Sequence, residues 1–268
     1  PLDKEIIAAL IAALDEAGLR AVRGREIAMI FQEPMSSLNP LLTVGLQIEE
    51  NLVAHTDLDA RARKARAVEL LDMVGIPAAR GRLGDFPHEF SGGMRQRVMI
   101  AIALASNPRL LLADEPTTAL DVTIQDQILR LIQQLAEELG MAMILVTHDM
   151  AVVAETCDRV AVMYGGRLCE TGETATVIGH ARHPYTLGLL RSIPRDVPPR
   201  TPLYSIPGAP PSLAAMPAGC AFSARCPVAG PECRDIRPKL AALSGGGLAA
   251  CHRLPEAAAF FSLREAAQ

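Results

Sequence analysis

Short, continuous apolar runs recur along the first two thirds of the chain, each bounded by polar or turn-forming residues. Runs of this length and composition are typical of strands that are buried on both faces of a sheet. The last two runs are shorter and are separated only by Gly165-Gly166. The strands are predicted over residues 26–31, 109–114, 141–147, 159–164 and 167–171.

Other segments carry apolar residues at helical spacing. Thr123 with Asp126 resembles a capping box at the start of one helix, and Gly140 suits its end. Helices are predicted over residues 2–19, 43–75, 94–105 and 123–139, and a loop over residues 34–40. Strand, helix and strand in alternation predict an α/β fold with a parallel sheet.

The composition of the chain changes after about Pro194, where proline becomes dense and four of the six cysteines follow. We therefore expect an α/β domain over residues 1–190 and a small Cys/Pro-rich extension over residues 191–268.

Half of the residues are hydrophobic and the net charge is −4. These values predict a globular protein and give no electrostatic reason to bind nucleic acid. No apolar run approaches the roughly 20 residues of a membrane-spanning helix, and we recognise no signal peptide, so a cytosolic location is expected. A role at a membrane would then require docking on other subunits.

Asp114 and Glu115 form a pair of carboxylates at the end of an apolar strand. Ligands bind at strand ends in open α/β sheets. Asp114 could hold Mg²⁺ through water, while Glu115 could polarise an attacking water molecule. The pair could also be two solvated acids at a strand tip.

Three further motifs gain meaning only beside this pair. Ser91-Gly92-Gly93 opens a helix, and bare N–H groups at a helix N-terminus attract anions. His148 follows the strand at 141–147 and could reach a phosphate or the attacking water. Gln32 follows the strand at 26–31 and could orient water or complete a Mg²⁺ shell. Each motif alone is weak evidence.

In this order, the motifs resemble those of the ATP-binding subunits of ABC transporters over almost the whole chain. The resemblance makes Gln32 the Q-loop residue, Asp114 the Walker B aspartate, Glu115 the catalytic glutamate and His148 the H-switch. It places the signature at residues 91–96 and the D-loop at residues 119–121. FQEPMSSLNP, FPHEFSGGMRQRVMIAIALA, ADEPTTALDVTIQ, VMYGGR and the HPYT beginning at His183 are similar to the dipeptide/oligopeptide importer branch, which includes nickel importers.

The resemblance implies a P-loop NTPase fold with a helical subdomain at about residues 34–105 and a dimer that sandwiches ATP and Mg²⁺. It also implies a homo- or heterodimeric second ATPase subunit, transmembrane permease subunits and, indirectly, an extracytoplasmic solute-binding protein, at the cytoplasmic face of the inner membrane. A soluble ABC ATPase of DNA repair or translation is the alternative. The residues expected to contact nucleotide or Mg²⁺ are Gln32, Ser91, Gly92, Gly93, Gln96, Asp114, Glu115, Asp121 and His148.

The family grips phosphate with G-x-x-x-x-G-K-[ST]. The three lysines, Lys4, Lys64 and Lys239, each lack this context. We expect the chain to be a fragment or the product of a mis-started reading frame, and inactive by itself. The alternative is a degenerate subunit that lends its signature to a partner's nucleotide.

Cys220, Cys226, Cys233 and Cys251 have the spacing C-x5-C-x6-C-x17-C. Disulfides are rare in the cytosol, and four thiols in a segment with little core suggest a metal site. A [4Fe–4S] cluster is favoured over Zn²⁺ because paired C-x2-C spacing is absent, and some members of the similar importer branch carry such a cluster. The alternative is four free thiols.

Overall fold

The computed structural model describes residues 13–33, 37–118, 120–193 and 204–265. The chain divides into two compact units, Pro1–His148 and Asp149–Gln268, each described by itself below. Parts of four predictions lie outside the described residues: the first ten or so residues of the helix at 2–19, the loop at 34–36, Ala119 of the D-loop and the proline-rich segment at 194–203.

The first unit holds a three-stranded parallel sheet with the order β1-β2-β3. Its strands are β1 (Ile27–Ile30), β2 (Leu110–Asp114) and β3 (Ala142–Val146), which confirms three of the predicted strands. The helices are α2 (Glu16–Val22), α4 (Val44–His55), α5 (Ala60–Met73), α6 (Ala79–Arg82), the 3-10 turn η1 (Pro87–Glu89), α7 (Gly92–Leu104) and α8 (Val122–Glu138).

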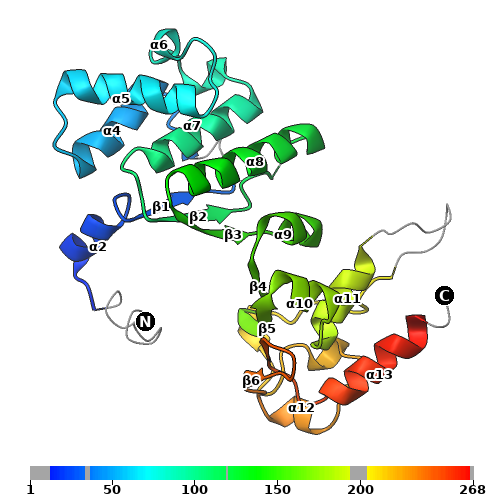
Figure 1. The fold of residues 1–268 in the computed structure, drawn as a ribbon. Coiled ribbons are helices and arrows are strands. Elements are labelled where there is room, and N and C mark those ends of the chain that lie inside the picture. The colour runs from blue at the N-terminus through cyan, green and yellow to red at the C-terminus, as the bar shows by residue number, and fades with distance from the viewer. Residues whose placement is uncertain (1–12, 34–36, 119, 194–203, 266–268) are drawn as a thin grey trace. The chain divides into compact units, whose positions relative to one another are not determined.

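One face of this sheet packs against the helices and the other does not (Figure 1). Ala28, Ile30 and Leu111 are buried in a core shared with α7 and α8. On the opposite face, Ile144 is 51% exposed and Val146 is 52% exposed. Within the described residues the sheet is therefore covered on one side only.

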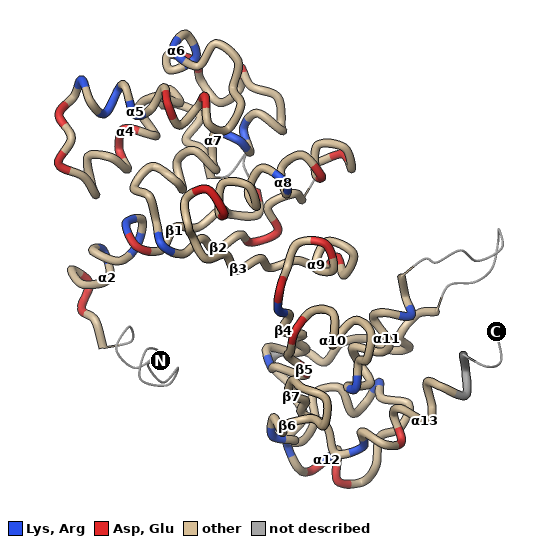
Figure 2. The backbone as a smooth tube through the Cα atoms, viewed as in Figure 1, with Lys and Arg blue, Asp and Glu red and all other residues tan. Residues whose placement is uncertain are grey.

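The prediction of one continuous helix over residues 43–75 is wrong in one respect. The structure has two helices in this range, because α4 ends at His55 and α5 begins at Ala60. Asp59 begins α5 as an N-cap, and its carboxylate accepts a hydrogen bond from the Ala62 N–H (2.7 Å). Capping carboxylates satisfy backbone donors that a continuous helix would pair internally. α4 carries acidic residues but no Lys or Arg, whereas α5 and α8 carry residues of both signs (Figure 2).

The second unit is built around a four-stranded antiparallel sheet with the order β4-β5-β7-β6. β4 (Arg159–Tyr164) and β5 (Arg167–Glu173) confirm the last two predicted strands, and Gly165 and Gly166 form the turn with φ of 56° and 71°. The remaining elements are α9 (Met150–Thr156), α10 (Thr174–Gly179), α11 (Pro184–Ser192), η2 (Leu213–Ala215), η3 (Ser223–Arg225), α12 (Glu232–Asp235), β6 (Ala241–Ala242), β7 (Leu248–Ala249) and α13 (Leu254–Glu265).

An aromatic cluster forms a small core in the described part of this unit. Phe222 is buried against the rings of Tyr164 and Tyr185, with centroid separations of 5.2 and 5.4 Å. Arg225 lies over the Tyr164 ring at 5.9 Å.

The domain boundary predicted near residue 190 falls inside this unit, within α11, and the division at 190 stays a prediction. No helix in the described ranges is both long and apolar enough to cross a membrane.

Candidate functional site

The candidate site lies where the three parallel strands of the first unit end. Gln32 follows β1, Glu115 follows β2 and His148 follows β3. In a parallel sheet the carboxyl ends of the strands meet at one edge, which brings these three residues together. The register places Asp114 opposite Val146, and the Glu115 N–H extends the pairing by donating to the Val146 carbonyl (2.9 Å).

Glu115 is the centre of a hydrogen-bonded cluster. Its Oε2 accepts from the Gln32 amide (3.0 Å) and from the Thr118 hydroxyl (2.9 Å). Its Oε1 shares a hydrogen bond with His148 Nδ1 (3.0 Å). The bonds from His148 and then Thr118 hold the pKa of the Glu115 carboxyl below its usual range. The carboxylate is therefore ionised and aimed by three side chains from different loops.

The backbone of Glu115 is strained, with φ of 42°. A residue that carries a Cβ seldom adopts this left-handed conformation, and such outliers gather at functional sites. The turn after Glu115 is closed by the Thr118 N–H, which donates to the Glu115 carbonyl (3.1 Å).

Sequence reasoning missed Thr118. Its hydroxyl reaches Glu115 because a tight turn brings residue i+3 back toward residue i. The available signal was a hydroxyl residue three positions after a glutamate at the end of a strand.

Asp114, the last residue of β2, is half-buried, and in the described part of the chain no hydrogen bond joins it to Gln32.

Ser91 begins α7 as its N-cap, and its hydroxyl accepts from the Met94 N–H (3.4 Å). Ser91 and Gly92 are exposed at this helix start, as an anion contact requires. Gln96 is 1% exposed, and its Nε2 has no partner within the described residues. This burial does not fit the nucleotide contact expected from Gln96, because the side chain faces the core.

Asp121, and not the predicted pair of Thr123 and Asp126, caps α8. Its carboxylate accepts from the Ile124 N–H (3.0 Å), so the capping-box prediction is wrong. The Asp126 carboxylate instead pairs with Arg130 at 2.9 Å, one turn further along the helix.

Asp121→Ala is expected to lower the free energy of unfolding by about 1 kcal/mol, because α8 loses its side-chain cap. Asp121→Asn should stay close to wild type, since its amide oxygen caps equally well. Chemical denaturation followed by circular dichroism would measure both. Equal losses in the two variants would show that the charge, and not the cap, stabilises this end.

The four clustered cysteines line one small cavity of the second unit, together with His183 and His252. Burial, followed by neighbouring thiols, raises the pKa of Cys226 to about 12. Burial also raises the pKa of Cys251, to about 11. Among the described residues, however, no group of three or more His, Cys, Asp or Glu side chains is arranged to hold a metal ion. The thiols converge without forming a ready-made metal site.

Comparison with known proteins identifies the family. The protein family described as "ABC transporter" matches residues 9–118, and the family described as "Oligopeptide/dipeptide transporter, C-terminal region" matches residues 169–233. A peptide import ATP-binding protein of Brucella melitensis is 53% identical over 255 residues, which are 93% of this chain and 75% of that protein. The chain belongs to the ATP-binding subunits of the oligopeptide/dipeptide ABC transporter family.

A second relative and a solved structure agree with this family. The dipeptide transport ATP-binding protein DppD of Escherichia coli is 47% identical over 239 residues, 89% of this chain and 73% of DppD. The dimeric ATP-binding cassette MJ0796, solved with ADP and Pi, is 34% identical with a TM-score of 0.54, over 60% of this chain and 68% of that chain. The predicted P-loop ABC fold is therefore confirmed.

Proposed function

We propose that this chain is the ATP-binding and ATP-hydrolysing subunit, with Mg²⁺, that energises an ABC importer of dipeptides or oligopeptides. Because its 268 residues contain no G-x-x-x-x-G-K-[ST] motif, we expect no hydrolysis from the chain by itself, and the tests below use the assembled transporter. The observation that carries the proposal is the convergence of Gln32 and His148 on Glu115 at the ends of three parallel strands. Membership of the oligopeptide/dipeptide family supports the solute class.

The proposed roles are those that the family resemblance gives to these residues, and the convergence on Glu115 supports them. Glu115 polarises the attacking water, while Gln32 and His148 contact the γ-phosphate side of the site. Asp114, with Gln32, holds Mg²⁺. Ser91, Gly92, Gly93 and Asp121 face nucleotide across a dimer with a second ATPase subunit. The dimer docks on permease subunits at the cytoplasmic face of the inner membrane, and hydrolysis reopens it.

Gly92→Asp tests the dimeric site without disturbing α7. Among the described residues, an added Cβ at Gly92 meets only Leu120 Cδ2, at 3.7 Å, and an aspartate in the first turn suits the helix dipole. The new charge would repel phosphate, so ATP hydrolysis by the co-purified transporter should fall at least about tenfold. Gly92→Ala is the matched control and should remain near wild type. Full activity of Gly92→Asp would contradict the proposed signature contact.

We further propose that Cys220, Cys226, Cys233 and Cys251 bind a [4Fe–4S] cluster, with Zn²⁺ as the alternative. Support comes from the single cavity that all four line. Binding would require the side chains to turn and the thiols to lose their protons, which a metal ion promotes. The cluster has no step in the ATP reaction proposed above.

Metal analysis of anaerobically purified chain tests this second proposal. We expect iron and sulfide in the wild type and in Cys157→Ser, and their loss in Cys226→Ser. Zinc without iron would select the alternative. A wild-type chain that contains neither metal would contradict the proposal.

A further inference from the structure

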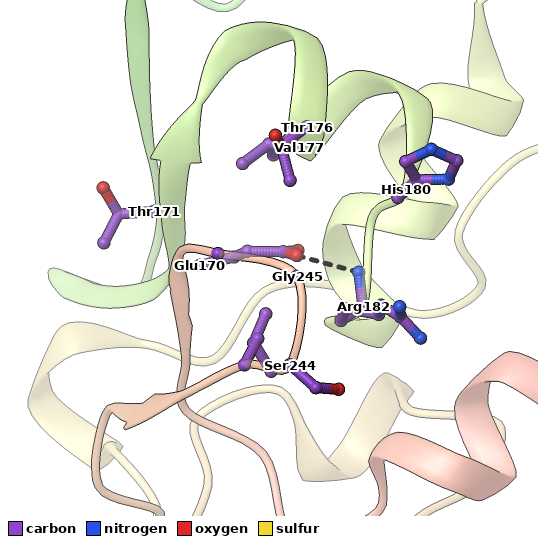
Figure 3. Close-up of a pocket in the computed structure, with 10 residues that line it drawn as sticks. Glu170, Thr171, Thr176, Val177, His180, Arg182, Ser244 and Gly245 are labelled. Atoms are coloured by element: carbon purple, nitrogen blue, oxygen red, sulfur yellow. Dashed lines mark hydrogen bonds between the residues drawn. The ribbon is translucent and has the colours of Figure 1, made fainter.

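A second cavity of the second unit lies between α10 and the loop that joins β6 to β7 (Figure 3). Its volume is about 70 Å³, which is room for several water molecules or one compact solute. The Glu170 side chain lies across it, with Thr176 and Val177 on one side and Ser244 and Gly245 on the other.

Glu170 is 1% exposed, which is unusual for a carboxylate. Its two oxygens accept from the backbone N–H groups of Arg182 (2.8 Å) and His183 (3.0 Å). Both donors are neutral, and no cationic side chain in the described residues forms an ion pair with Glu170. A buried carboxylate without a cationic partner is costly, so the cavity favours a ligand that carries positive charge.

The mouth of the cavity has the opposite character. His180 and Arg182 both line it and are exposed to solvent. The Arg182 guanidinium forms no ion pair among the described residues and can meet an anion. Thr176 and Ser244 add hydroxyl groups along the wall. The site thus offers an acidic floor, a basic rim and polar sides.

We propose that this cavity binds a small zwitterion, a free amino acid or dipeptide, with its ammonium group toward Glu170 and its carboxylate toward Arg182. The cavity volume favours the smallest members of this class. The proposal concerns residues of the second unit only and does not depend on the ATPase assignment.

Titrations of the 268-residue chain with glycine and with glycylglycine, followed by amide NMR, test the proposal. At least one of the two should give saturable shifts at Glu170, Thr176, Ser244 and Gly245, and which one does so separates amino acid from dipeptide. N-acetylglycine lacks the ammonium group and glycinamide lacks the carboxylate. Each should bind at least about tenfold more weakly than glycine, because each loses one charge-assisted contact.

Arg182→Gln should weaken binding at least about tenfold, since the exposed guanidinium can be removed without opening the core. Arg234→Gln, an exposed arginine of the same unit outside the cavity, is the matched control and should bind as wild type. Glu170→Gln should also abolish binding if it folds, while Arg182→Gln and the blocked ligands decide the matter if it does not. Shifts that fail to saturate, or equal affinity for N-acetylglycine, would overturn the proposal.

Discussion

Glu115→Gln should lower ATP hydrolysis by an assembled transporter containing this chain at least about 100-fold, the usual loss when a general base is removed. Glutamine keeps the size of the side chain and one acceptor for Gln32 or Thr118, so the surrounding loops should remain in place. It has neither the charge that pairs with His148 nor the capacity to take a proton from water. Phosphate release at saturating ATP measures the loss.

Glu137→Gln is the matched control, because Glu137 is exposed on α8, away from the strand ends. Nucleotide binding, measured separately, should be nearly unchanged in Glu115→Gln. If Glu115→Gln retained full hydrolysis while Gly92→Asp lost it, the chain would be lending only its signature to a partner's nucleotide. That pair of results would select the degenerate-subunit alternative.

Phe222→Ala should lower the free energy of unfolding of the second unit by about 3–5 kcal/mol. Phe222 fills the centre of a small core, in contact with Tyr164 and Tyr185. A core this small has few other large side chains to close over the resulting cavity. We therefore expect the second unit to unfold at lower denaturant concentration than in the wild type.

The chain itself supplies the probe for this measurement. It has no tryptophan, and its three tyrosines, Tyr164, Tyr185 and Tyr204, all lie in the second unit. Tyrosine fluorescence during urea unfolding therefore reports this unit alone. Ile236→Ala removes an exposed side chain of the same unit and should cost much less. Equal losses in both variants would show that the aromatic cluster is not the stabilising core.

The sequence predicted the strands and the site for the same physical reason. The continuous apolar runs predicted strands buried on both faces; the strands are present, but within the described residues their sheet is covered on one face only. Polar residues placed directly after such runs gather at one edge of a parallel sheet. Gln32, Glu115 and His148 were found in this way. Thr118 was missed because its role depends on the path of a turn, which apolar periodicity does not encode.

Other features depend on tertiary contacts that no local pattern shows. Gln96 belongs to the polar signature motif at residues 91–96, yet its side chain is buried in the structure. Asp121 caps α8 in place of the predicted Thr123, because the Asp121 carboxylate is the group that accepts from the Ile124 N–H. In the second unit, α10 and α11 were not predicted, since each packs on small clusters and not on one long apolar face.

The left-handed backbone at Glu115 has a consequence for any attempt to improve this protein by selection. Glycine and asparagine tolerate that conformation, whereas glutamate held there carries about 1–3 kcal/mol of strain. A library of variants selected only for thermal stability would therefore enrich substitutions of Glu115 that stabilise the fold but abolish ATP hydrolysis. Turnover must be scored in the same round as heat resistance.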